Sequence, residues 1–209
     1  MSLRDIAHSL FAEAIAKQGP SSIVYESSKK YDAHFQDATR IFPVAVGKAS
    51  VEMMSGLLDY LNENHPSKIY KRPIVVSNPQ EMTSPHNFTH IVSSHPTPDA
   101  SSLNAARMVL DYINQSSKTD LAIFLISGGG SSLLSLAADG ISLDDKVELT
   151  QLLLASGCNI NDINTVRKHV SQIKGGRLNS AALPSRSISL LISDAVSYTH
   201  LTLPTNREV

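Results

Sequence analysis

Residues 121–134, LAIFLISGGGSSLL, join an unbroken apolar run to three glycines and then to a potential helix start. The run 121–126 predicts a strand that is buried on both faces, as strands are in a parallel sheet covered by helices. Successive glycines allow several backbone N–H groups to point toward one place, and a helix start adds partial positive charge there. We therefore predict that this glycine loop (residues 127–132) binds a phosphate or carboxylate group through Ser127, Gly128, Gly129, Gly130, Ser131 and Ser132.

A tight strand-to-helix turn without any ligand is the alternative interpretation of the glycine loop. The loop matches neither the GxxxxGK(S/T) pattern of a Walker A motif nor the GxGxxG pattern of a dinucleotide-binding fold. The sequence therefore favours an anion site of a different kind.

Short apolar runs alternate with helical patterns on either side of the loop, which indicates a parallel sheet covered by helices. Strands are predicted at residues 41–46, 74–77, 89–93 and 188–192. Helices are predicted at residues 48–64, from Asp99 to Ile113, from Ser142 to Gly157 and at residues 160–174. The expected fold class is α/β, with three layers and a mostly parallel sheet flanked by helices.

Composition argues against several classes of function. With 209 residues the chain is long enough for one sizeable domain, and its net charge of −1 gives no field that recruits nucleic acid or an anionic membrane. A single cysteine, Cys158, excludes an internal disulfide and a cysteine-based zinc cluster. Residues 1–18 predict an amphipathic helix rather than a signal peptide, and no apolar run approaches the ~20 residues that span a bilayer. We expect a cytoplasmic protein that binds neither nucleic acid nor membrane.

Lys48 follows the predicted strand 41–46, in the sequence Gly47-Lys48-Ala49-Ser50. Ligands of open α/β sheets bind at the carboxyl ends of the strands, and a lysine there can hold a transferring phosphoryl group by its charge. A surface lysine at a helix start is the alternative interpretation of this residue.

The segment SSHPTPD (residues 93–99) follows the predicted strand 89–93. Its two prolines stiffen the loop and so fix the directions of His95 and Asp99. His95 is a candidate for binding substrate or moving a proton, with a purely structural role as the alternative. For Asp99 we favour a role as a helix cap.

A basic run, NTVRKHVSQIKGGRL, occupies residues 164–178 and is predicted to lie mostly on the helix 160–174, which Gly175 and Gly176 end. The helix would bury Ile163, Val166, Val170 and Ile173 and carry Asn164, Arg167, Ser171 and Lys174 on another stripe. No acidic residue occurs between Asp162 and Asp194. A solvated basic face is the simpler interpretation, but such faces usually mix charges, so we favour an anion site.

Asp194 ends the segment Ile192-Ser193-Asp194, directly after the last predicted strand. An aspartate in this position can hold Mg²⁺ in a site of phosphoryl transfer. Taken alone, however, an aspartate at a strand end is common.

In chain order, the segments GKAS, HPTPD, SGGGSSLL, NTVRKHVSQIKGGRL and LLISD resemble the type-2 glycerate kinases, which carry a C-terminal MOFRL domain. The resemblance extends over most of residues 1–194. It implies a Rossmann-like first domain, a smaller second domain and the ATP-dependent, Mg²⁺-dependent phosphorylation of D-glycerate to 2-phosphoglycerate. It also implies catalytic roles for Lys48 and Arg167, binding of phosphate and substrate by His95, Lys174, Arg177 and the glycine loop, and a metal-binding role for Asp194.

The end of the chain departs from the family pattern. The last residues, SYTHLTLPTNREV, resemble a sequencing-adapter tail more than an evolved protein. We therefore expect residues 1–194 to form an incomplete N-terminal domain, and residues 195–209 to be a non-native tail. The expected partners are glycerate and a nucleotide, with a homodimer as a further option.

Three other functions or states stay open. Some relatives are labelled hydroxypyruvate reductases, but a reductase predicts a nicotinamide-binding fingerprint, which the sequence lacks. A non-catalytic module that binds phosphate or nucleotide would keep the glycine loop and the basic run without needing Lys48 or Asp194. An unstable fragment would aggregate through its exposed apolar surface.

Overall fold

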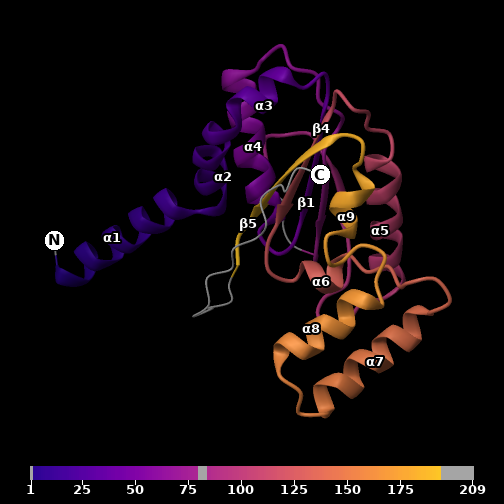
Figure 1. The fold of residues 1–209 in the computed structure, drawn as a ribbon. Helices are drawn as coiled ribbons and strands as arrows, with labels where there is room; N and C mark the ends of the chain where they lie inside the picture. Colours follow the sequence, from indigo (N-terminus) through magenta and orange to yellow (C-terminus); the bar gives the residue numbers. More distant parts are fainter. Residues whose placement is uncertain (1, 80–83, 194–209) are drawn as a thin grey trace.

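The fold is a parallel sheet between two layers of helices, as seen in a computed structural model that describes residues 2–79 and 84–193. The sheet has five strands in the order β3-β2-β1-β4-β5, and every neighbouring pair within it is parallel. The strands are β1 (Ile41–Val46), β2 (Ile74–Ser77), β3 (Thr89–Val92), β4 (Leu121–Ile126) and β5 (Arg186–Leu191). This arrangement confirms the predicted α/β class and the predicted three layers (Figure 1).

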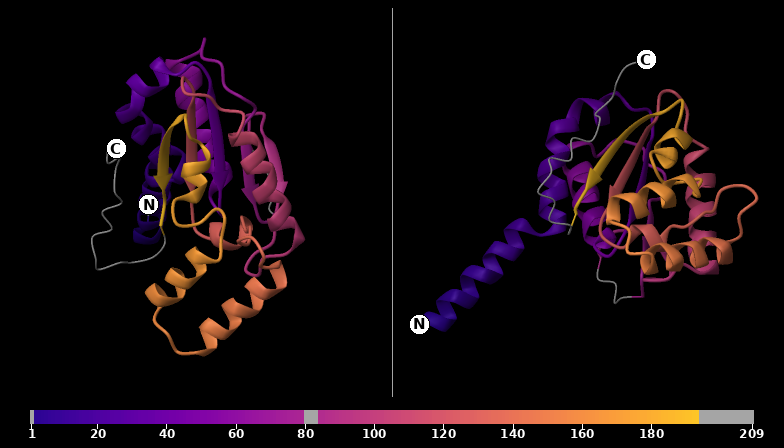
Figure 2. Two further views of the ribbon diagram at one scale, coloured as in Figure 1. Left: turned by 45° about the vertical axis from the view of Figure 1, so that its right-hand side comes forward. Right: turned by 60° about the horizontal axis from the view of Figure 1, so that its bottom comes forward.

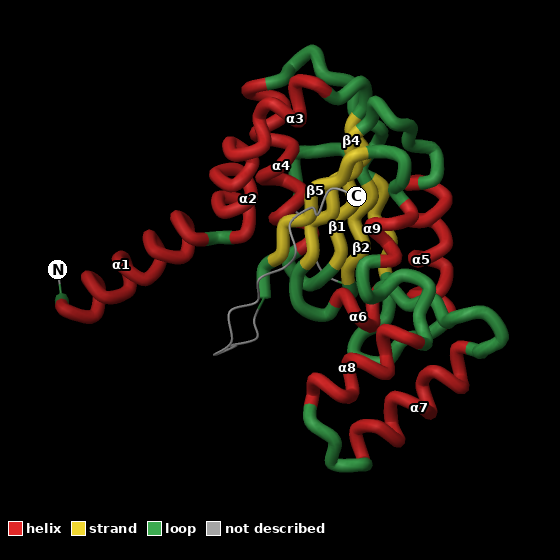
Figure 3. Tube along the Cα trace, in the orientation of Figure 1, coloured by secondary structure: helices red, strands yellow, loops and turns green. Residues whose placement is uncertain are grey.

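The helices cover both faces of this sheet (Figures 1 and 3). One face carries α2 (Pro20–Ser28), the 3₁₀ helix η1 (Lys29–Tyr31), α3 (Asp32–Asp37) and α4 (Ser50–Asn64). The other face carries α5 (Ala100–Ile113), α6 (Gly130–Leu133) and α9 (Arg177–Ala181). Two helices, α7 (Leu143–Ala155) and α8 (Ile160–His169), lie side by side beyond α6, at the carboxyl ends of the strands (Figure 2).

The alternation of side chains along β1 divides the hydrophobic core into two halves. Ile41 and Ala45 pack against the α4 side, whereas Phe42, Val44 and Val46 pack against the α5 side. Successive side chains of a strand point to opposite faces of the sheet, so one apolar run supplies both halves. β1 and β4 are consequently buried along almost their whole length, which holds the loops that follow them in fixed positions.

The N-terminal segment forms the predicted helix, α1 (Leu3–Gln18), which Ser2 and Asp5 cap reciprocally. α1 extends away from the sheet (Figure 2, right) and leaves Leu3, Leu10 and Phe11 exposed. None of the helices in the described ranges is long and apolar enough to cross a membrane.

The predicted helix cap at Asp99 is confirmed, and α7 begins with a second cap. The carboxylate of Asp99 accepts hydrogen bonds from the backbone N of Ser101 and Ser102, at the start of α5. Ser142 and Asp145 form a reciprocal capping box at the start of α7. These local interactions were predictable because they involve residues only two or three positions apart.

The helix predicted at residues 160–174 is wrong in its extent, because α8 already ends at His169. Ser171 pairs with Ala137 in the segment after α6, and its hydroxyl accepts from the backbone N of Lys174 at 3.3 Å. A serine side chain that bonds nearby backbone competes with the helical hydrogen bonds. Ser171 and Lys174 therefore lie in a turn (residues 170–176) between α8 and α9.

At the opposite, amino-terminal edge of the sheet, the half-buried Arg40 pairs with the buried Asp120. Arg40 Nη2 lies 2.6 Å from Asp120 Oδ2, and Asp120 is fully buried. Burial alone would raise the pKa of Asp120, but the hydrogen bonds from Arg40 and Ser117 outweigh it and hold this pKa at about 2.

We expect Asp120→Asn to lower the free energy of unfolding by about 2 kcal/mol at pH 7. The pKa of Asp120 is lower in the folded than in the unfolded state, so its contribution is present above about pH 4 and is lost as the pH falls toward 2. Urea unfolding of both proteins at pH 7 and at pH 3 checks the expectation. A difference between the proteins that is equally large at both pH values would contradict it.

Candidate active site

The carboxyl ends of all five strands lie at one edge of the sheet, because every pair is parallel. From β1 the chain proceeds to β2 and β3 on one side, and then to β4 and β5 on the other side. The strand order therefore reverses between β1 and β4, and open α/β sheets bind their ligands at such a switch point. The loops that follow these two strands contain Lys48 and the glycine loop.

Hydrogen bonds join the ends of β1 and β4 into one rigid unit. Ser127 N donates to Val46 O at 2.9 Å, and Lys48 N donates to Gly128 O at 2.9 Å. The hydroxyl of Ser127 accepts from Ala49 N at 3.0 Å. Gly47 has a φ of +130°, and a Cβ there would lie 2.1 Å from Ser127 Oγ. The side chain of Ser127, predicted to bind phosphate, is thus engaged in holding the two loops together.

Three of the predicted site residues meet at Gly129. A Cβ at this position would lie 3.0 Å from Cδ2 and 3.2 Å from Nε2 of His95, and 3.4 Å from Cγ of Lys48. Gly129 also has a φ of +87°, which favours glycine. The structure therefore brings together residues from the loops after β1, β3 and β4, although they lie far apart in the sequence.

Hydrogen-bond donors at this place are available to a ligand. Lys48 is exposed, and its ammonium group makes no hydrogen bond or ion pair with any described residue. Within the described ranges, the backbone N–H groups of Gly128, Gly129 and Ser131 also have no acceptor. The hydroxyl of Ser132, by contrast, donates to Gly129 O at 3.1 Å. A cation beside several N–H donors can hold an anion such as a phosphate.

α6 adds less to this site than the sequence suggests. It has only four residues, so backbone N–H groups of the glycine loop, rather than the dipole of a long helix, provide the partial positive charge.

The basic run contributes Lys174 to the same region. Lys174 Nζ donates to the carbonyl oxygens of Ser131 at 2.8 Å and Leu134 at 3.3 Å, next to the glycine loop. Burial, together with the positive charges of Lys146 and Arg167, lowers the pKa of Lys174 to about 7. Arg167 is half-buried, and its guanidinium donates to Asn164 Oδ1 at 3.4 Å.

Arg177 has a different environment from the other predicted cations. Its guanidinium donates to the backbone carbonyl oxygens of Lys168 and Ser171, and so holds the turn 170–176 against the end of α8. The structure gives Arg177 a clear part in shaping this turn.

Two polar residues at this edge were not predicted. Lys146 of α7 is 5 % exposed, and a single lysine among the acidic residues of LDDKVE gave no signal. Asn78 follows β2, and its buried Oδ1 has no hydrogen-bond partner in the described part of the chain. Because β2 and β1 are neighbouring parallel strands, Asn78 belongs to the same edge as Lys48.

No group of three His, Cys, Asp or Glu side chains in residues 2–79 and 84–193 is arranged to hold a metal ion. Asp194 and the expected tail 195–209 lie outside the described residues. Protein sites for Mg²⁺ often supply only one or two carboxylates and leave the other positions to phosphate and water. Asp194 therefore stays the predicted metal ligand.

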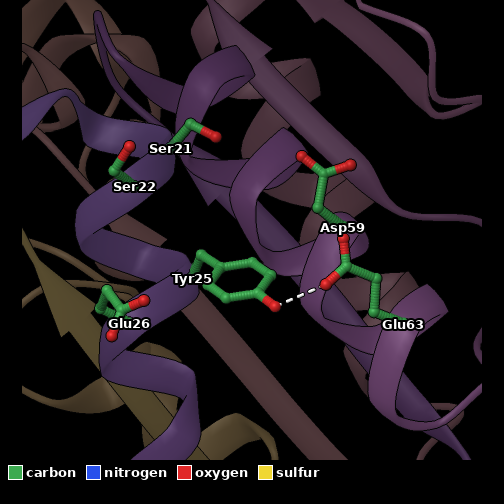
Figure 4. Close-up of a pocket in the computed structure, with 6 residues that line it drawn as sticks. All are labelled: Ser21, Ser22, Tyr25, Glu26, Asp59 and Glu63. Atoms are coloured by element: carbon green, nitrogen blue, oxygen red, sulfur yellow. Dashed lines mark hydrogen bonds between the residues drawn. The ribbon is translucent and has the colours of Figure 1, made fainter. Parts of the chain in front are cut away.

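A separate pocket of about 300 Å³ lies between α2 and the C-terminal half of α4 (Figure 4). Tyr25 Oη donates to Glu63 Oε2 at 2.5 Å across it, and Glu26 and Asp59 add two more carboxylates. Negative charge disfavours phosphate, and the pocket lies away from Lys48, which precedes the opposite end of α4. This pocket is not part of the candidate site.

Comparisons with known proteins point to one family. Residues 6–201 match the family model described as "Domain of unknown function (DUF4147)". The chain is 35% identical over 195 residues to the "D-glycerate 2-kinase" of Thermotoga maritima, covering 93% of this chain and 45% of that protein. It is also 35% identical to a "Putative hydroxypyruvate reductase" of Agrobacterium vitis, covering 93% of this chain and 42% of that protein.

A solved structure has the same fold. The crystal structure of a glycerate kinase from Thermotoga maritima is 34% identical, with a TM-score of 0.79, over 92% of this chain and 44% of that chain. The chain thus spans less than half the length of the relatives it matches.

Proposed function

Since the chain belongs to the family described as "Domain of unknown function (DUF4147)", whose members similar to it include glycerate 2-kinases, we propose that it is the N-terminal part of such a kinase. The proposed reaction transfers the γ-phosphoryl group of ATP to D-glycerate and gives 2-phosphoglycerate. The observation that carries this proposal is the meeting of Lys48, His95 and Gly129 at the switch point of the sheet.

The geometry suits phosphoryl transfer because this reaction depends mainly on positioning and on neutralising charge. We propose that the free N–H groups of Gly128, Gly129 and Ser131 bind phosphate oxygens. The ammonium group of Lys48, which has no described partner, would neutralise the charge that develops on the transferred group. His95, packed against the same glycine, would orient the hydroxyl group of glycerate.

The remaining predicted residues complete this assignment as proposals. Arg167 and Lys174 would neutralise further negative charge of phosphate or of the substrate carboxylate. Mg²⁺, when bound with ATP, supplies additional charge neutralisation at the phosphates, with Asp194 as its protein ligand. Ser127, Ser132 and Arg177 would act mainly by holding the glycine loop and the turn 170–176 in place.

The two other candidate functions make different demands on the site. A hydroxypyruvate reductase needs a nicotinamide site, and the loop between β4 and α6 lacks the GxGxxG spacing. A module that only binds phosphate could use the glycine loop and Lys48 without any turnover, so the formation of products distinguishes it from the kinase.

We expect equimolar ADP and 2-phosphoglycerate when Mg·ATP and D-glycerate are supplied. Phosphorus NMR of the products measures this for the chain alone and for the chain joined to the part of the Thermotoga maritima relative that it does not cover. Hydroxypyruvate with NADH serves as the control reaction. NADH consumption without ADP formation would support the reductase, and nucleotide binding without turnover in the joined protein would support the binding module.

A further inference from the structure

Three cations from three segments gather beyond the glycine loop: Lys146 of α7, Arg167 of α8 and Lys174 of the turn 170–176. We call them the cation cluster. Lys146 Nζ donates to Ser135 Oγ at 2.9 Å and to Leu136 O at 3.2 Å. Lys174 Nζ contacts Ser131 O and Leu134 O. Both ammonium groups therefore contact residues 131–136, the segment that includes the end of the glycine loop and the residues just after it.

The cluster has no negative partner in the described part of the chain. Among the described residues both ammonium groups contact only neutral oxygens, and each ammonium has three N–H donors, so a donor is left over. Three carboxylates on the neighbouring segments are engaged elsewhere: Asp139 accepts from Gln172, Asp145 caps α7 through Ser142, and Asp162 accepts from Asn159. Lys146 is buried, whereas Arg167 and Lys174 are half-buried. Buried charges are normally paired, so a buried lysine without an anionic partner indicates a missing anion.

The pKa values of Lys146 and Lys174 are both lowered, partly by the positive charges of neighbouring residues. Burial, followed by the charge of Arg167, lowers the pKa of Lys146 to about 8. The same causes, with Lys146 added, lower the pKa of Lys174 to about 7. Other titratable groups on the same segments are engaged: His169 at the end of α8 has a ring nitrogen 2.8 Å from Thr165 O, and Asp139 accepts from Gln172. A dianion bound by the cation cluster would favour the protonated forms of its lysines.

We propose that the cation cluster binds a phosphate group next to the exit of the glycine loop, and that Lys146 is one of its binding residues. Three cations suit a dianionic phosphate better than a singly charged carboxylate. The inference rests on the proposed function for the location of the site, but it requires only binding and no turnover. The phosphate belongs either to the nucleotide or to the phosphorylated acid.

Isothermal titration calorimetry of the 209-residue chain tests this with inorganic phosphate, 2-phosphoglycerate and Mg·ATP. Titrations at pH 8 in two buffers of different ionisation enthalpy also give the number of protons taken up. We expect binding with net proton uptake, and about tenfold weaker binding for Lys146→Met, because a hydrogen bond to a charged group is lost. Lys118→Met is the matched control, since Lys118 is exposed and precedes β4 at the opposite edge.

The ligand series identifies the source of the phosphate. Weaker binding of 2-phosphoglycerate but not of Mg·ATP assigns the cluster to the phosphorylated acid, and the reverse pattern assigns it to the nucleotide. Unchanged binding of all three ligands by a folded Lys146→Met, or no binding of any of them by the wild-type chain, would overturn the proposal.

A second variant keeps the test decisive if Lys146→Met does not fold, as judged by circular dichroism. Lys146→Arg keeps a permanent charge, so we expect affinity within about threefold of wild type and less proton uptake at pH 8. If Lys146→Arg took up as many protons on binding as the wild-type chain, the proposal would be overturned. Failure of the proposed kinase would look different, because phosphate binding would depend on Lys146 while no 2-phosphoglycerate formed.

Discussion

Replacing Lys48 with methionine should lower the rate of phosphoryl transfer to D-glycerate about 100- to 1,000-fold, the usual effect of removing one preorganised charge from a transition state. The reason is that Lys48 has no described protein partner for its ammonium group and lies against Gly129 and beside His95. An exposed side chain without such contacts contributes little to stability, so we expect the free energy of unfolding to change by less than about 0.5 kcal/mol.

The measurement is the steady-state rate of ADP formation by the chain joined to the remainder of the Thermotoga maritima relative, together with thermal unfolding. Lys118→Met removes the same charge far from the site and should leave the rate unchanged. Lys48→Arg keeps the charge but changes its geometry, so we expect only partial activity. A rate for Lys48→Met within about threefold of wild type would exclude the catalytic role.

Gly47→Ala should lower the free energy of unfolding by about 2–5 kcal/mol, since it combines backbone strain with overpacking. Its Cβ would lie 2.1 Å from Ser127 Oγ and 2.7 Å from Ser127 O, at a φ of +130°. The backbone of β4 cannot move away without breaking the hydrogen bonds that join it to β1. We also expect the variant to lose phosphate binding, because the same contact positions the glycine loop.

Gly140→Ala separates the effect of backbone strain from the effect of overpacking. Gly140 also has a positive φ, +80°, but a Cβ there meets nothing within 4 Å. We expect a loss of about 1 kcal/mol from strain alone. Urea unfolding of both variants measures the difference, and equal losses would show that overlap with Ser127 is not important.

The strands were predictable because their signal is local and strong. β1 is a short apolar run followed by Gly47, β4 is one followed by Ser127 and three glycines, and the predicted limits of both match the structure. The meeting of Lys48, His95 and Gly129 was partly predictable, because strand ends converge in any open parallel sheet. Which loops become neighbours depends on the strand order, which sequence patterns do not contain.

The basic run shows where local patterns fail. Helical spacing placed Lys174 and Arg167 on one stripe of a single helix, whereas the structure ends α8 at His169 and brings Lys174 to the glycine loop through a turn, still close to Arg167. Pairing between Ser171 and Ala137 decides this, and such a long-range contact leaves no periodic signal. The sequence did not predict a role for Lys146 because its burial also depends on a long-range contact, the packing of α7 beyond α6.

The central position of β1 has a consequence during synthesis. β1 pairs with β2 on one edge and with β4 on the other, and about 75 residues separate it from β4 in the chain. At translation rates of 5–20 residues per second, about 4–15 seconds pass between the synthesis of β1 and the synthesis of β4, and during this time the second edge of β1 is unpaired. An apolar strand with an open edge is prone to wrong pairing in that interval, so the nascent chain would benefit from a chaperone until residue 126 has left the ribosome.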